Sequence, residues 1–296
     1  MTLWIPITIV AAFFQNVRNS LQRHLLSSLS PEGASYLRFL YAVPFTLLYF
    51  TGLRAYTGEV VSLPSSEFVV FALMGGVAQI LATVFLIRAF SLGSFAVGTA
   101  LSKTEALYAA LFGFVLLGEG VSLLAIAGIL ISLVGVAALS LAGKDTVEKR
   151  WVGAGALYGL VSGALFAFAA VTYRGAALSV ASENFLVQAG YTQLCVTVVQ
   201  ALSMGGYIAW RDRSELRRII QVWRPAILVG LTGMLASGLW LIAMALERAA
   251  YVRTLGQIDL IFAFVVSTLI FRERATARDV VGVALIATGL ALVVLA

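Results

Sequence analysis

Three ionisable side chains lie in the middle of long apolar stretches of this chain. Lys103 and Glu105 stand two positions apart in "ALSKTEALYAALFGFVLLGE" (100–119), and Asp259 lies in "LGQIDLI" (255–261). An ionisable side chain at the centre of a membrane helix costs about 2.5 to 3.5 kcal/mol on insertion scales, so it normally faces protein or a water-filled cavity. These charges are therefore candidates for contact with a polar cargo or with protons.

The two neighbouring charges need different partners, because residues two apart on a helix point about 200° away from each other. Asp259 is the natural partner for Lys103, which leaves Glu105 to face a cavity or Arg88. Three interpretations stay open. The charges form a closed pair that locks two helices in register, they contact substrate or protons directly, or they lie nearer the membrane surface than the residue count suggests.

The composition around these charges is typical of a membrane protein. Of the 296 residues, 61% are apolar and 11% are charged, whereas a soluble domain carries about 25% charged residues. Ten continuous apolar segments are each long enough to cross a hydrocarbon core of about 30 Å as a helix. We expect an all-α membrane protein with spans at 2–22, 33–52, 66–90, 95–117, 121–142, 151–174, 184–210, 225–247, 251–271 and 277–296.

The chain also contains an internal repeat with a constant offset of 154 residues. The segment "LLGEGVSLLAIAGILISLVGVAAL" (116–139) aligns with "IFRERATARDVVGVALIATGLALV" (270–293). The aligned pairs include Glu119 with Glu273, Gly128 with Gly282, Gly135 with Gly289, Glu105 with Asp259 and Lys103 with Gln257. Each half is therefore expected to repeat the same five helices.

The basic residues show opposite biases in the two halves. When the turns that flank each connection are included, sixteen of the twenty Lys and Arg residues belong to connections that follow odd-numbered helices. Five helices per repeat invert the second copy, and the positive-inside rule places the basic side in the cytoplasm, with both termini outside. We expect a first five-helix repeat at 1–143, a basic cytoplasmic linker at 144–150 and an inverted second repeat at 151–296.

This layout and two helix-start motifs resemble a known transporter family. The motif Leu-Gly-Glu ends at Glu119 in "FGFVLLGEGVSLLAIAGILISLVGVAAL", and Phe-Arg-Glu ends at Glu273 in "VSTLIFRERATARDVVGVALIATGLALVVL". The five-plus-five helix layout with these two motifs resembles the drug/metabolite transporter superfamily, in its ten-helix EamA-type branch. The resemblance implies helices around a central cavity, alternating access, and commonly the export of amino acids or other metabolites. Family members often carry a proline near the positions of Glu105 and Asp259, which this chain lacks.

Polar and aromatic side chains in the expected spans complete the candidate substrate site. Tyr108 shares a helix face with Glu105, and Gln79 and Trp240 lie on helices that line the cavity in the family that the chain resembles. Each neutral side chain taken alone is more often a packing residue. The predicted site is Lys103, Glu105, Tyr108, Gln79, Trp240, Gln257 and Asp259. At the helix starts, Glu119 and Glu273 are expected to cap free amides instead.

The predicted function is a secondary active or facilitative transporter of the cell inner membrane that exports small amphipathic metabolites. Amino acids, aromatic or neutral, are the leading substrates, because a zwitterion suits a site with both signs of charge plus Tyr108 and Trp240 for an apolar side chain. One alternative is an exporter of organic cations or drugs, since carboxylates with aromatics attract cations. The other is a membrane scaffold without transport.

Catalytic and metal-binding motifs are absent from the sequence. It contains no phosphate loop, no HExxH, no CxxC and no Ser/His/Asp set, and Cys195 and His24 have no partner at ligand spacing. We therefore expect no enzyme, no cofactor and no metal. The net charge of +6 is interpreted as an orientation signal rather than a nucleic-acid surface. The expected partners are the lipid bilayer and a small-molecule substrate, and no oligomer is required.

Overall fold

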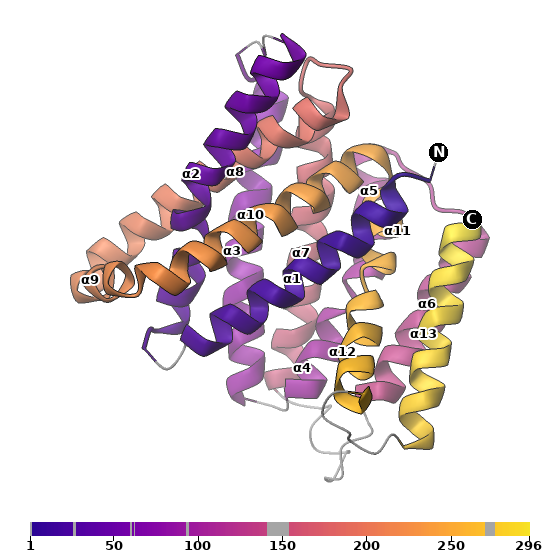
Figure 1. The fold of residues 1–296 in the computed structure, drawn as a ribbon. Helices are drawn as coiled ribbons and strands as arrows, with labels where there is room; N and C mark the ends of the chain where they lie inside the picture. The colour runs from indigo at the N-terminus through magenta and orange to yellow at the C-terminus, as the bar shows by residue number, and fades with distance from the viewer. Residues whose placement is uncertain are drawn as a thin grey trace. The chain divides into compact units, whose positions relative to one another are not determined.

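The protein is described here by a computed structural model. The described residues are 2–25, 28–59, 61, 63–92, 95–140, 154–269 and 276–296. Within these ranges the backbone forms thirteen α-helices and no strand (Figure 1). The chain divides into two compact units, and each unit takes residues from both halves of the sequence.

The first unit combines Met1–Val77 with Thr172–Leu246. In it α1 packs along α10, and α2 packs along both α8 and α10. Its helices are α1 (Trp4–Leu25), α2 (Pro31–Thr57), the first part of α3 (Ser66–Leu92), the end of α7 (Ala154–Leu178), α8 (Phe185–Arg211), α9 (Arg213–Gln221) and α10 (Trp223–Leu246).

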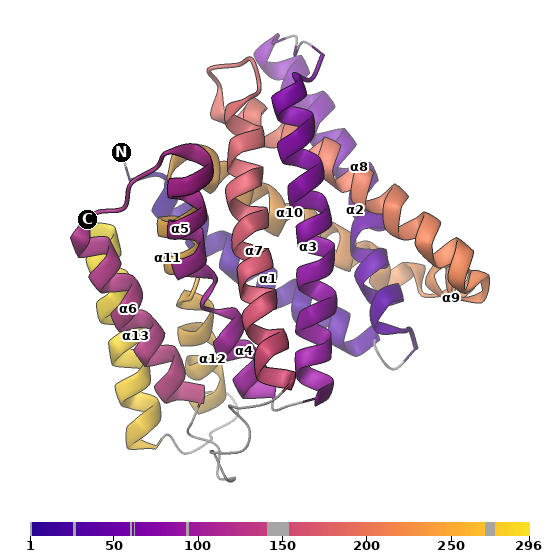
Figure 2. The ribbon, with the colours of Figure 1, turned by 180° about the vertical axis from the view of Figure 1, so that it is seen from behind.

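The second unit combines Ala78–Val171 with Glu247–Ala296. In it α6 packs along α13, and α5 packs against α11 (Figure 2). Beside the remaining parts of α3 and α7, its helices are α4 (Phe95–Ser102), α5 (Glu105–Leu117), α6 (Leu123–Ser140), α11 (Ala249–Leu255), α12 (Ile258–Leu269) and α13 (Ala277–Leu295).

Helices α6 and α13, which are aligned copies in the sequence repeat, pack against each other in antiparallel directions. A Cβ atom on Gly128 would lie 2.7 Å from the carbonyl oxygen of Gly289, and one on Gly135 would lie 2.7 Å from that of Gly282. Gly128 therefore contacts the repeat copy of Gly135, and Gly135 contacts the repeat copy of Gly128. The absence of side chains at these positions lets the two backbones approach closely, as at other membrane helix contacts.

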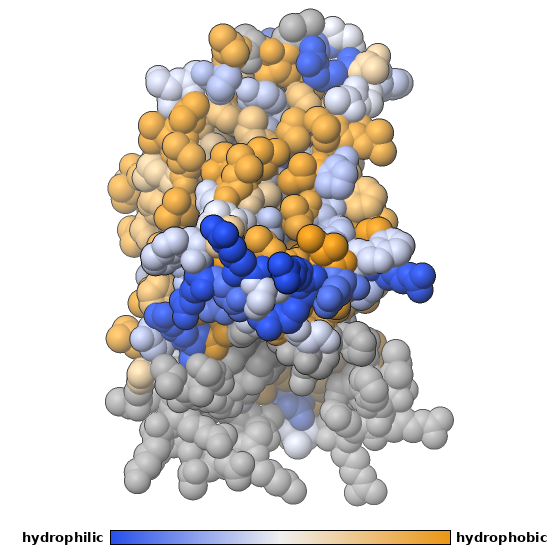
Figure 3. Space-filling model, turned by 90° about the vertical axis from the view of Figure 1, so that its left-hand side faces the viewer, coloured by the Kyte–Doolittle hydropathy of each residue, from blue (hydrophilic) through white to orange (hydrophobic). Residues whose placement is uncertain are grey.

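Eight helical stretches of the described residues are long and apolar enough to cross a membrane. Large apolar side chains are correspondingly exposed, among them Leu48 and Phe114. Figure 3 shows a broad apolar surface on one side of the molecule. The two expected spans outside this set are 2–22 and 251–271. The first is found as α1, whose second half is polar, and the second contains α11 and α12, which are only seven and twelve residues long. Ten spans remain a prediction from the sequence.

One expectation about the helix starts is corrected by the structure. Glu119 does not begin a helix, because α6 starts only at Leu123. Gly118 instead ends α5 in the left-handed region, with φ of 66°, and its N–H donates to the carbonyl of Phe114. The motif Leu-Gly-Glu is thus the end of a helix rather than the start of one. Glu273 and the linker at 144–150 lie outside the described residues.

Candidate functional site

The expected fourth and ninth spans are each interrupted, at equivalent positions of the sequence repeat. The fourth consists of α4 followed by α5, and the ninth contains α11 followed by α12 (Figure 2). The N–H of Thr104 donates to the carbonyl of Leu101 at 3.3 Å, and the N–H of Gln257 donates to that of Thr254 at 3.0 Å. These bonds span three residues rather than four, so both interruptions are tight turns of the 3₁₀ type.

Each interruption places a carboxylate in the first turn of the helix that follows. Glu105 is the first residue of α5 and Asp259 the second residue of α12, where the positive end of the helix dipole stabilises negative charge. Lys103 Nζ lies 2.6 Å from Asp259 Oδ2, and Arg253 Nη1 lies 3.9 Å from Glu105 Oε2. The predicted pair between Lys103 and Asp259 is confirmed. All four side chains are only 11 to 12% exposed.

Arg253 is the member of this group that the sequence analysis missed. It was counted among the orientation charges, because it lies near the expected start of the ninth span. The structure places it on α11 and brings its guanidinium to Glu105, for which the sequence suggested a cavity or Arg88. Its position could have indicated this role, because Arg253 lies six residues before Asp259 and inside an apolar segment.

Several polar atoms of residues at or within one turn of the two helix breaks are buried and have no hydrogen-bond partner among the described residues. They are both amide atoms of Gln257, Oγ1 of Thr99 and Oδ1 of Asp259. Gln257 is fully buried. Such a buried polar group costs about 1 to 3 kcal/mol if it stays unsatisfied. We name the six residues Thr99, Lys103, Glu105, Arg253, Gln257 and Asp259 the break cluster.

Aromatic side chains follow the break cluster along α5. Tyr108 lies one turn after Glu105, and its ring stacks on that of Phe112 with centroids 6.3 Å apart. The Phe112 ring meets the edge of Phe168 on α7 at 5.5 Å. This part of the second unit therefore offers an apolar aromatic surface within one to two helical turns of a buried carboxylate.

The other two predicted site residues lie in different surroundings. Gln79 is half-buried on α3, and its carbonyl accepts a hydrogen bond from the Thr83 hydroxyl at 2.9 Å. Trp240 belongs to the first unit, where it is buried and donates its Nε1–H to Gln15 Oε1 at 3.0 Å. The contact of either residue with a substrate stays a prediction.

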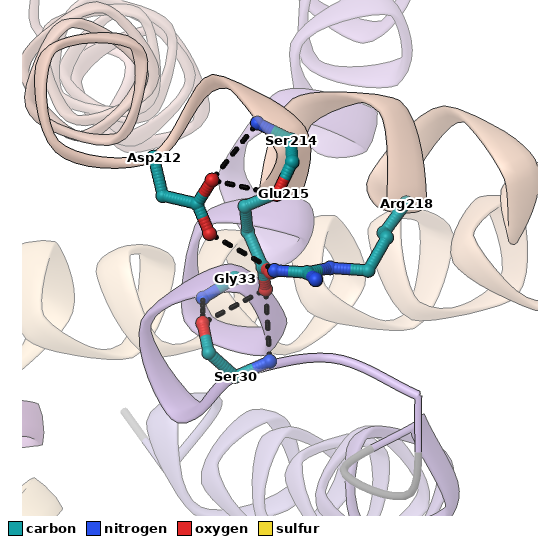
Figure 4. Close-up of polar contacts among 6 residues, drawn as sticks. All are labelled: Ser30, Gly33, Asp212, Ser214, Glu215 and Arg218. Atoms are coloured by element: carbon teal, nitrogen blue, oxygen red, sulfur yellow. Dashed lines mark hydrogen bonds and ion pairs between the residues drawn. The ribbon is translucent and has the colours of Figure 1, made fainter.

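A second group of charges, in the first unit, is organised differently (Figure 4). Glu215 on α9 is buried, and its Oε1 accepts hydrogen bonds from both the N–H and the hydroxyl of Ser30, each at 2.8 Å. Arg218 donates to Glu215 and also pairs with Asp212 at 3.0 Å. A Cβ on Gly33 would lie 2.0 Å from Glu215 Oε1, so the close approach depends on glycine.

We name the residues Ser30, Asp212, Ser214, Glu215 and Arg218 the α9 anchor. Burial alone would raise the pKa of Glu215, but the hydrogen bonds from Ser30 and Arg218 bring it below its ordinary value. Hydrogen bonds from Ser214 lower the pKa of Asp212, and the bond to Glu215 raises the pKa of Arg218. All three groups are therefore charged at neutral pH, and they hold the start of α9 against the start of α2.

The comparisons with known proteins agree with this membrane architecture. The model of the EamA-like transporter family matches the chain twice, over residues 2–141 and over residues 153–295. A solved crystal structure aligns with 98% of this chain and 95% of its own, with a TM-score of 0.68 and 18% identity, which shows a shared fold alone. No curated protein matches the sequence. The two family matches cover almost the whole length, so this chain belongs to the EamA-like transporter family, whose members carry small molecules across membranes.

Proposed function

We propose that the protein exports small zwitterionic metabolites, with neutral and aromatic amino acids as the leading substrates, and that the break cluster contacts the substrate. The observation that carries the proposal is the set of buried polar atoms of Gln257, Thr99 and Asp259 that have no partner in the described part of the chain. A polar ligand at this position would supply the missing hydrogen bonds. A purely structural lock would have no use for them.

The charge balance of the break cluster favours a zwitterion over an organic cation. Two cationic and two anionic side chains give the cluster no net charge. A bound zwitterion can exchange with both pairs, its carboxylate toward Lys103 or Arg253 and its ammonium toward Glu105 or Asp259, and leave no charge uncompensated. An organic cation would add a positive charge to a buried site, where an uncompensated charge costs about 3 to 5 kcal/mol.

The aromatic surface on α5 and α7 supports a neutral or aromatic side chain on the substrate. Tyr108, Phe112 and Phe168 pack against one another near Glu105. Aromatic rings bury large apolar areas and stack favourably with other rings. These three rings offer no opposite charge to a charged substrate side chain.

The transport cycle that we propose is alternating access between two inverted five-helix repeats in the inner membrane. Two observations support it: the helix breaks occur at equivalent positions 154 residues apart in the sequence, and the aligned helices α6 and α13 run antiparallel. Discontinuous helices at the substrate site are a common feature of inverted-repeat transporters. With the basic connections in the cytoplasm, a reporter fused to the C-terminus is expected outside, and a cytoplasmic signal would refute this orientation.

Counterflow in proteoliposomes tests the substrate class. Vesicles loaded with an unlabelled neutral or aromatic amino acid are expected to accumulate the labelled one, and Lys103→Ala is expected to abolish the exchange. A quaternary ammonium compound is assayed in parallel. Saturable exchange of that cation without exchange of any amino acid would instead support the cation exporter. No exchange of either by correctly folded protein would support a scaffold.

A further inference from the structure

Helix α9 connects two helices that are each able to cross a membrane. α8 ends at Arg211 and α10 begins at Trp223, and both are long and apolar enough to span. α9 has nine residues and occupies the connection between these two ends (Figure 1). It therefore lies at the boundary between the bilayer and water.

The two faces of α9 have opposite environments. Glu215 and Ile219, one turn apart, are 3% and 0% exposed, and they face the protein where α9 packs against α2. Arg213 and Arg217, also one turn apart, are exposed on the outward face. The buried carboxylate of Glu215 thus faces inward, and Arg213 and Arg217 face outward.

The arginines near α9 outnumber the carboxylates. From position 211 to position 224 the chain has five arginines and two carboxylates, and both carboxylates belong to the α9 anchor. Among the described residues, no carboxylate lies within ion-pair distance of Arg213 or Arg217. Like charges four residues apart on a helix repel each other, so an external anion would stabilise this face.

Exposed apolar rings flank the arginines. Trp210 and Trp223 are 84% and 49% exposed, and Ile220 between them is 63% exposed. Tryptophan rings at the ends of spans settle at the level of the lipid headgroups. On the side of the molecule that carries α9, a hydrophilic band lies directly beneath a broad apolar surface (Figure 3).

We propose that Arg213 and Arg217 on the outward face of α9, together with the exposed Arg224 at the start of α10 and the rings of Trp210 and Trp223, bind the phosphate headgroup of an anionic phospholipid. Guanidinium groups present parallel N–H donors that match phosphate oxygens. The arginines at the headgroup level and the apolar rings beside them together fit a lipid, which carries its phosphate directly above acyl chains.

Native mass spectrometry of the full-length protein in detergent tests this proposal. The protein is titrated with phosphatidylglycerol and, in parallel, with phosphatidylcholine of the same acyl chains. Wild type is expected to retain phosphatidylglycerol preferentially. Arg213→Gln with Arg217→Gln is expected to weaken that retention about tenfold, since each basic residue near an anionic surface adds to the attraction. Retention of phosphatidylcholine should not change.

Arg54→Gln is the matched control, because Arg54 is an exposed arginine in the last turn of α2, far along the helix from its contact with α9. It is expected to retain phosphatidylglycerol like wild type. Equal retention by wild type and the double variant, or an equal loss in Arg54→Gln, would overturn the proposal. Full displacement of the lipid by glycerol phosphate would show that a soluble phosphate compound is the ligand instead. Because the readout is lipid retention, its outcome is independent of the transported substrate.

Discussion

The break cluster and the α9 anchor are built from the same kinds of charged residues, but their polar atoms are hydrogen-bonded to different degrees. In the α9 anchor, Glu215 accepts hydrogen bonds from Ser30 and Arg218. In the break cluster, both amide atoms of Gln257 and one carboxylate oxygen of Asp259 lack a partner in the described ranges. A completed network holds a structure together, whereas an incomplete one in the interior has room for a ligand's hydrogen bonds.

Removing one charge from the break cluster should have the largest effect. Lys103→Ala leaves the carboxylate of Asp259 buried without its partner, which destabilises by about 3 to 5 kcal/mol. We expect loss of counterflow and a lower melting temperature. Combining Lys103→Ala with Asp259→Ala should restore the melting temperature but not transport. Restored transport in the double variant would show that the pair is only a lock.

Removing the central carboxylate of the α9 anchor should affect stability alone. Glu215→Ala leaves the part-buried N–H of Ser30 without its carboxylate acceptor and Arg218 without one of its two acids, at a cost of about 1 to 3 kcal/mol. Thermal unfolding should report this loss, while counterflow per folded molecule stays at the wild-type level. A change in substrate affinity in Glu215→Ala would contradict the expectation that the α9 anchor affects stability alone.

Substitution of Gln257 is expected to raise stability and to lower transport. Gln257→Leu keeps a similar volume and removes two buried polar atoms that lack partners in the described structure. The melting temperature should therefore rise, by the equivalent of about 1 to 2 kcal/mol, while amino-acid counterflow falls. A decrease in both would mean that Gln257 is an ordinary packing residue.

The smallest effect is expected from pH. The pKa of Glu215 is lowered in the folded protein below its ordinary value of 4.5, so its contribution to stability is present above that value and is lost as the pH falls through the folded-state pKa. The difference in melting temperature between wild type and Glu215→Gln should be constant near neutral pH and shrink below pH 4.5. If the difference in melting temperature stayed constant down to acidic pH, the ionised Glu215 carboxylate would not be the source of the stabilisation.

Patterns within the sequence predicted the apolar helices, the repeat and the pairing of Lys103 with Asp259. These depend on composition, on a fixed offset and on the strong requirement that a buried lysine have an acidic partner. Eight of the expected spans correspond to helices able to cross a membrane.

The helix breaks and the role of Arg253 could not be predicted in the same way. No glycine or proline marks the break at Lys103 and Thr104, so the usual signals of interruption are missing there. The contact between Arg253 and Glu105 joins residues far apart in the sequence and exists only after folding brings α11 to α5. Likewise, the partner of Glu215 is Ser30, in a loop 185 positions away.

The most direct test compares Asp259→Asn with Glu215→Gln in amino-acid counterflow. Both substitutions replace a buried carboxylate by an amide of nearly the same size. If the break cluster contacts a zwitterion, Asp259→Asn should raise the half-saturating concentration about tenfold or abolish exchange, since it removes an ionic contact of about 1.5 to 3 kcal/mol. Glu215→Gln should leave that concentration unchanged. Wild-type affinity in Asp259→Asn would contradict the proposed site.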